Sequence, residues 1–200
     1  MIAPRKKIRS LPSLSRENWV KAAINLIAQE GVQAVAVEPL ALALGVTKGS
    51  FYWHFRNRDE LILAALEVWE QDQSADVVSR YGGIEDPVKR LRLLLFAAFE
   101  DVENGKFFAA LAVSSEDPRV QPCLRRATER RLTFGAEAFQ AMGLSAEEAR
   151  QRALLAYAAY AGYFQLLRTT PDAVAAVTDL SGYVRRLADA LVPRKPGRRV

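Results

Sequence analysis

The chain of 200 residues has a single cysteine, Cys123, and a single histidine, His54. One cysteine excludes an internal disulfide framework and a cysteine-rich zinc site, and it suits a reducing compartment. One histidine argues against a multi-histidine metal centre and against a serine–histidine catalytic pair. The sequence therefore predicts a protein without a metal, a cofactor or catalytic residues, and His54 has no partner ligand nearby.

Long apolar runs are lacking as well. The longest uncharged stretch, Ala153 to Leu167, is shorter than the ~20 residues that a membrane-spanning helix needs. The basic N-terminus has no apolar segment of the kind that a secretory signal contains. Half of the residues are hydrophobic and 26% are charged, which is a globular composition. We therefore expect a cytoplasmic protein with no membrane partner.

Positive charge is concentrated at one end of the chain. Residues 1–58 contain nine Lys or Arg and three Asp or Glu, whereas residues 59–200 contain 19 and 20. A cationic head on a nearly neutral body is expected when that head meets a polyanion such as DNA. The alternative is a basic arm that only improves solubility.

Hydrophobic residues recur at helical spacing almost everywhere after Ser15, and Pro, Gly and N-cap residues punctuate the pattern. The stretch 32–37 is strand-like, but it has no hairpin partner and is expected to be a connecting loop. The fold class is therefore all-α. The pattern predicts helices over about 16–30, 40–44, 47–55, 58–79, 86–103, 106–113, 118–141, 145–169 and 172–191.

The pattern also predicts the domain boundaries. Residues 1–14 form a disordered basic arm and residues 193–200 a basic tail. Residues 15–60 form an N-terminal domain of three short helices, and residues 61–192 form a C-terminal bundle of longer helices.

Residues 38–55 fit a helix-turn-helix, in which the second helix enters the major groove of DNA. Ala41 is small where the following helix crosses, and Gly45 stands where the turn needs a positive φ. Val46 and Phe51 supply apolar anchors between the two helices. Many helical hairpins share this pattern, so by itself it does not distinguish a DNA-binding helix pair from another one.

The segment from Thr47 to Leu61 resembles the signature of the TetR family of transcriptional regulators, and Arg16 to Gly31 resembles that family's first helix. The resemblance covers about residues 16–66, whereas the body is similar only in length and helix count. It implies a helix-turn-helix DNA-binding domain, a bundle that binds a small molecule and dimerises, and a repressor released from a palindromic operator. One departure is that Val35 and Ala36 stand where members commonly have Ser or Thr, and Glu38 comes soon after them.

Three properties select the candidate DNA contacts. The N–H groups at a helix start attract phosphate, Lys and Arg add charge, and Tyr, His and Ser donate hydrogen bonds. The aromatic run could instead be core, but Phe51 and Phe55 are four residues apart and are the better core candidates, which leaves Tyr52 and Trp53 exposed. The candidate DNA-binding residues are Ser15, Thr47, Lys48, Gly49, Ser50, Tyr52, Trp53, His54 and Arg58. Glu38 would repel phosphate.

In the body, an apolar helix with small residues and a second apolar stripe favour a homodimer over a monomer. The candidate interface is Ala158, Ala161, Gly162, Val177, Leu180, Val184 and Leu187. Aromatic residues could line a pocket for an apolar or aromatic effector; the candidates are Trp69, Phe96, Phe99, Phe107, Phe108, Phe134, Tyr157 and Tyr160. Arg125, Arg126, Arg130 and Arg131 are expected on a solvated helix face.

Several functions are consistent with these observations. The favoured one is a ligand-responsive repressor that binds double-stranded DNA as a homodimer. An activator of the same family, an all-α enzyme that uses a cavity in the body, and an RNA or architectural binder that recognises charge alone are the alternatives.

Overall fold

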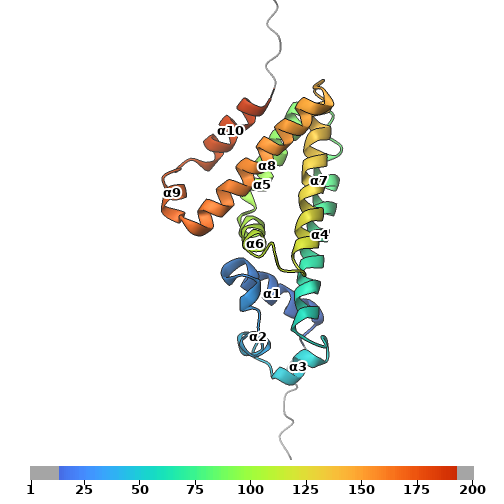
Figure 1. Ribbon diagram of the computed structural model, residues 1–200, viewed down its shortest axis with the longest axis vertical. Coiled ribbons are helices and arrows are strands. Elements are labelled where there is room, and N and C mark those ends of the chain that lie inside the picture. The colour runs from blue at the N-terminus through green and yellow to red at the C-terminus, as the bar shows by residue number, and fades with distance from the viewer. Residues whose placement is uncertain (1–13, 193–200) are drawn as a thin grey trace, which may run out of the picture.

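The computed structural model describes residues 14–192, with the side chains of residues 72–79 left out, so the predicted arm and tail lie almost wholly outside it. Within that range the chain is helical and contains no strand, which confirms the predicted fold class (Figure 1). The α-helices are α1 (Arg16–Glu30), α2 (Val37–Ala43), α3 (Lys48–Tyr52), α4 (Arg58–Tyr81), α5 (Pro87–Glu100), α6 (Val102–Val113), α7 (Gln121–Gln140), α8 (Ala146–Thr169), α9 (Pro171–Ala175) and α10 (Leu180–Leu191).

Helices α1 to α3 and the start of α4 form a head at one end of the molecule (Figure 1). Trp19 and Ile27 on the buried face of α1 and Phe51 of α3 are all fully buried. The Trp19 and Phe51 rings meet edge to face with centroids 5.3 Å apart, and Phe51 stacks on Phe55 at 5.4 Å. These contacts confirm Phe51 and Phe55 as core residues and fix α3 against α1.

Local signals in the sequence predict most of the helix ends. Asn57 accepts a hydrogen bond from the Glu60 N–H (2.9 Å) and Ser145 accepts one from the Glu148 N–H (3.2 Å), as expected of N-caps. Gly45 has the predicted positive φ of 68° in the turn between α2 and α3. Thr47 occupies the N-cap position of α3, but its hydroxyl makes no capping hydrogen bond.

Several predicted boundaries are wrong. The pattern predicts helices over 86–103 and 106–113, but α5 ends at Glu100 and α6 begins at Val102. The connection 32–37 contains a 3₁₀ turn, Val32–Ala34, and α2 begins at Val37, two residues before Pro39. The predicted helix 172–191 is two helices, α9 and α10. Asp179 starts the second of these because its carboxylate accepts the Gly182 N–H at 2.7 Å.

The body is built on the long helices α4, α7 and α8. Helix α4 leaves the head and runs beside α7, while α7 packs along α8 and α10 packs against α5 (Figure 1). Helix α6 lies between head and body because it packs against both α1 and α8. Among the described helices, none is long and apolar enough to cross a membrane.

Candidate DNA-binding interface

Helix α3 lies at the end of the head that points away from the body (Figure 1). Its inner face carries Phe51, which is fully buried, and its outer face carries Lys48 and Tyr52, one turn apart. Tyr52 is 55% exposed and Trp53, directly after the helix, is 88% exposed. Two aromatic side chains open to solvent on a small head form the kind of surface that a partner covers.

The predicted DNA-binding residues fall into three groups in the structure. Thr47, Lys48, Gly49, Tyr52 and Trp53 are exposed along α3, while Ser50 and His54 are half-buried there. Ser15 is exposed at the start of α1, where its N–H and its hydroxyl both donate to Asn18 Oδ1 (2.9 and 2.8 Å). Arg58 forms the third group, because its guanidinium contacts backbone carbonyls of the head.

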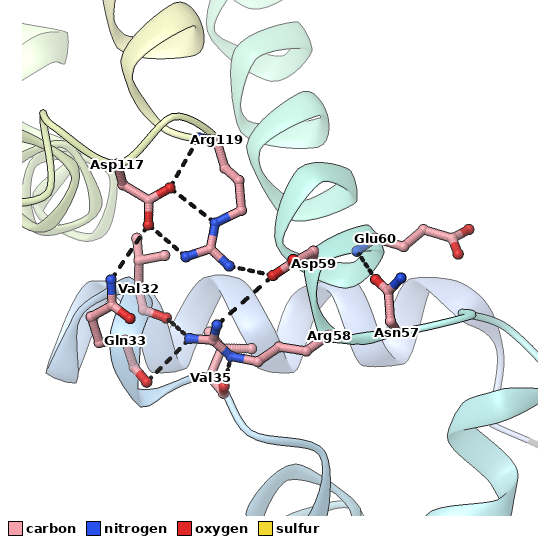
Figure 2. Close-up of polar contacts among 9 residues, drawn as sticks. All are labelled: Val32, Gln33, Val35, Asn57, Arg58, Asp59, Glu60, Asp117 and Arg119. Atoms are coloured by element: carbon pink, nitrogen blue, oxygen red, sulfur yellow. Dashed lines mark hydrogen bonds and ion pairs between the residues drawn. The ribbon is translucent and has the colours of Figure 1, made fainter.

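The side chain of Arg58 is directed toward the turn between α1 and α2 (Figure 2). Its guanidinium donates to the backbone carbonyls of Val32 (3.0 Å), Gln33 (3.2 Å) and Val35. These carbonyls belong to the turn between α1 and α2, in which the Val32 carbonyl also accepts the Val35 N–H at 3.3 Å. Arg58 therefore stabilises the turn on which α2 rests, and its assignment as a DNA contact stays a prediction.

Lys48 is restrained by an acidic neighbour. Its Nζ donates to Glu38 Oε1 at 2.6 Å, which joins the first residue of α3 to α2. The Lys48 ammonium lowers the pKa of the Glu38 carboxyl, and the carboxylate raises the pKa of the Lys48 amine. Both side chains are more than half exposed, so the pair competes with any phosphate that Lys48 approaches.

Replacing Glu38 by glutamine should raise the affinity for DNA. The substitution frees Lys48 from this exposed ion pair, and a dimer would gain the effect twice, so the expected gain in affinity is about 2–30-fold. Glutamine keeps the shape of the side chain and removes the charge that repels phosphate. Titration of labelled duplex at fixed salt checks the gain. A lower affinity would mean that Glu38 orients Lys48 productively.

Most of the predicted pocket aromatics meet inside the body. Phe99, Phe107, Phe108, Tyr160 and Trp69 are buried, whereas Phe96, Phe134 and Tyr157 are half-buried. Ring contacts at centroid distances of 5.4–5.9 Å join Trp69 to Phe107, Phe108 to Tyr157 and Tyr160, and Phe99 to Tyr160. Among the described residues, Phe96 and Phe134 lie outside these ring contacts. We call this set of contacting rings the aromatic cluster.

Polar groups border the aromatic cluster. Tyr157 and Thr128 share a hydrogen bond through their hydroxyl groups (2.8 Å). Burial raises the pKa of Tyr160 to about 12, and among the described residues its hydroxyl has no hydrogen-bond partner. The guanidinium of Arg131 lies over the rings of Trp69, Phe108 and Tyr160, 5.2–5.6 Å from their centroids.

The expectation of a solvated arginine face on α7 is therefore only partly correct. Arg131 covers aromatic rings, and Arg126 and Arg130 form ion pairs with Glu70 of α4 at 2.7 and 2.6 Å. These pairs connect α4 to α7 along the outside of the body, and the Arg126 hydrogen bond lowers the pKa of Glu70 to about 2. Periodicity alone could not reveal them, because it does not show which helix faces α7.

The predicted interface residues also divide into groups. Ala158, Gly162 and Val177 are exposed, and Ala161, Leu180 and Leu187 are half-buried against the chain's own core. Val184 is only 1% exposed in a single chain, so it packs into the chain's own core, and its assignment to a dimer interface stays a prediction. It lies on the inner face of α10. In addition, Leu154, Leu155 and Leu166 of α8 are about half exposed, and the sequence interpretation did not single them out.

The sequence also missed a polar network at the junction of head and body. Figure 2 shows Gln33, Asp59, Asp117 and Arg119, from three separate segments, in contact with one another. No residue pattern in the sequence links these positions, because the contacts depend on how the loop between α6 and α7 lies against α4.

Comparison with known proteins agrees with this geometry. Residues 20–65 match the family model for bacterial regulatory proteins of the tetR family. The chain is 32% identical over 103 residues to a probable acrEF/envCD operon repressor of Escherichia coli and 29% identical over 101 residues to the transcriptional regulator AcrR of Shigella flexneri. These alignments cover 50% and 48% of this chain and 44% and 45% of those proteins.

The likeness to solved structures extends through the body. A TetR transcriptional regulator from Legionella pneumophila superimposes with a TM-score of 0.75 over 90% of this chain and 98% of that one, at 18% identity. The fold and the exposed α3 together define a helix-turn-helix protein with a helical C-terminal domain. Residues 20–65 therefore form a domain of the kind found in the tetR family of bacterial regulatory proteins, and the body shares the fold of a solved TetR regulator. The relatives of this chain are regulators, which does not support the enzyme alternative.

Proposed function

We propose that this protein is a transcriptional regulator that binds a palindromic DNA operator as a homodimer and releases it when a small molecule binds the body. The observation that carries the proposal is the outer face of α3, where Lys48, Tyr52 and Trp53 are exposed on the domain that matches the family. Repression is favoured over activation because one relative is named an operon repressor.

An apolar face on α8 supports the homodimer. Leu154, Ala158, Gly162 and Leu166 recur at four-residue spacing, so they form one stripe along the helix, and all four are exposed. Leu154 is 56% exposed and Leu166 is 49% exposed. Small residues in the middle of this stripe allow a second helix to approach closely. A two-fold partner that presents the same stripe would cover it.

The aromatic cluster supports an apolar or aromatic effector. Buried rings from α4, α5, α6 and α8 converge there, and Tyr157, Tyr160 and Arg131 add polar groups at its border. A site of this composition suits a molecule that buries an apolar body and makes a few directed hydrogen bonds. An effector bound between these helices would move α6, which also packs against α1 of the head.

Geometry connects the two sites in the proposed mechanism. Two recognition helices must lie about 34–36 Å apart to enter successive major grooves. A shift of the heads relative to the bodies changes this separation and lowers the affinity for the operator. To move the equilibrium almost completely, the effector must bind the released form more tightly by about 5.5 kcal/mol.

Selection of bound duplexes from a random pool tests this function. We expect the full-length protein to enrich two inverted half-sites whose centres are about one helical turn apart. A specific binder should prefer this sequence to random duplex by about 10³-fold or more. Enrichment of no sequence, with equal affinity for every duplex, would contradict the proposal and would favour the architectural alternative.

A further inference from the structure

Three segments that are far apart in the sequence meet where the head joins the body. They are the turn after α1, which carries Gln33, the start of α4, which carries Arg58 and Asp59, and the loop between α6 and α7, which carries Asp117 and Arg119. Figure 2 shows the polar contacts that connect these five residues. We call them the junction ring.

Asp117 and Arg119 form the rigid part of the junction ring. Arg119 donates to Asp117 from its backbone N–H (2.9 Å), from Nε (2.9 Å) and from Nη2 (2.5 Å). Their side chains are only 19% (Arg119) and 8% (Asp117) exposed. These hydrogen bonds lower the pKa of Asp117 to about 2, so the carboxylate stays ionised at neutral pH. A guanidinium bound through two nitrogens has one fixed orientation.

From this fixed pair, contacts extend to the head. Arg119 Nη1 donates to Asp59 Oδ1 at the start of α4, and Gln33 Nε2 donates to Asp117 Oδ2 at 3.4 Å. Arg58 closes the ring, because its Nη1 lies 3.9 Å from Asp59 Oδ1 and its Nη2 donates to the Gln33 carbonyl at 3.2 Å. The loop of the body therefore contacts both the turn before α2 and the first residues of α4 (Figure 2).

The position of the junction ring makes it more than a surface ion pair. The loop that carries Asp117 and Arg119 directly follows α6, and α6 contributes Phe107 and Phe108 to the aromatic cluster. Arg119 restrains the first turn of α4 on the side that faces this loop. A displacement of the loop after α6 would therefore act on the first turn of α4 through the contact between Arg119 and Asp59.

We propose that Arg119 is a positioning residue for operator binding: clamped by Asp117 and bound to Asp59, it sets the orientation of the head on the body and thereby the separation of the two recognition helices. This inference rests on the proposed function, because it assumes a dimer that binds two half-sites. Beyond the proposed function, it identifies the contact that makes the dimer selective for one spacing between the half-sites.

The test compares operators with altered spacing. Half-sites recovered by selection are placed at the optimal separation and at separations one and two base pairs longer or shorter, and the affinity of the full-length protein for each is divided by its affinity for a single half-site. We expect Arg119→Met to lower the preference for the optimal spacing by about tenfold, within the range of about 5–150-fold that coupled sites show. Asp117→Asn should have the same effect, and the double variant should be no worse than either single variant.

The matched control is Arg126→Met. This substitution also removes an arginine that connects α7 to α4, through Glu70, but it leaves the junction ring intact. It should retain the spacing preference. If Arg119→Met does not fold, as judged by circular dichroism, Asp117→Asn decides the question. An unchanged spacing preference in a folded ring variant would overturn the inference, whereas a wild-type protein that selects no paired half-sites would overturn the proposed function.

Discussion

Lys48→Ala and Tyr52→Phe should each weaken binding to the selected operator by at least about 30-fold. One contact to a base or a phosphate contributes about 1–3 kcal/mol, and a homodimer loses the contact twice, so the total is about 2–6 kcal/mol. Lys48 and the Tyr52 hydroxyl lie on the exposed face of α3. Phenylalanine retains the edge-to-face contact with the Phe51 ring (5.2 Å), so the head should stay folded.

Salt dependence separates the two variants. Loss of a phosphate-binding lysine reduces the slope of log K against log [salt] by about one for each lysine, so Lys48→Ala should lower it by about two in a dimer. Tyr52→Phe removes no charge and should leave the slope unchanged. The control is Arg150→Ala, in the first turns of α8 at the end of the body far from the head (Figure 1). Wild-type affinity for the operator in both α3 variants would contradict the assignment of this face to DNA binding.

Gly105→Ala should destabilise the body strongly. A Cβ on Gly105 of α6 would lie 2.1–2.3 Å from three ring atoms of Phe164 in α8. Phe164 is 1% exposed and contacts the rings of Phe99, Tyr160 and Tyr163, so it has no space into which to move. Overpacking typically costs about 1–3 kcal/mol, and we expect the upper end. This corresponds to a fall in melting temperature of about 6–12 °C for a chain of this size.

Gly135→Ala is the matched control for Gly105→Ala. Gly135 also lies inside a long helix, but its Cβ would meet only Ala153, whose Cβ would be 3.2 Å away. A shift of a few tenths of an ångström relieves that contact, and alanine is the better helix former. Thermal unfolding followed by circular dichroism measures both variants. Equal melting temperatures for Gly105→Ala and wild type would contradict the close approach of α6 to α8.

The head could be predicted closely from the sequence because its signals are local. Phe51 and Phe55 are one turn apart and carry the core, so Tyr52 and Trp53 had to lie outside, as they do. Gly45 indicated the turn and Asn57 the start of α4, and the structure confirms both. Each of these features depends on neighbours within about one turn of helix.

The features that the sequence did not predict involve partners from distant segments. Arg58 carries a charge that suits phosphate, but its guanidinium donates hydrogen bonds to the backbone carbonyls of the turn after α1. Val184 lies on an apolar stripe that could face a partner or the core, and only the packing of α10 against α5 and α8 decides between them. No pattern in the sequence indicates the contact made by Arg119, because its partner Asp59 lies 60 residues earlier in the chain.

Trp53 provides the most direct measurement of the interface. Of the three tryptophans, Trp19 and Trp69 are buried at 0% and 4% exposure, so Trp53 supplies the solvent-accessible fluorescence. The accessible fraction is measured by acrylamide quenching of the wild-type protein before and after it is saturated with the selected operator. We expect operator binding to protect Trp53 from acrylamide. Fluorescence anisotropy confirms that the complex has formed. If Trp53 then remains fully accessible to acrylamide, DNA binds another face of the protein.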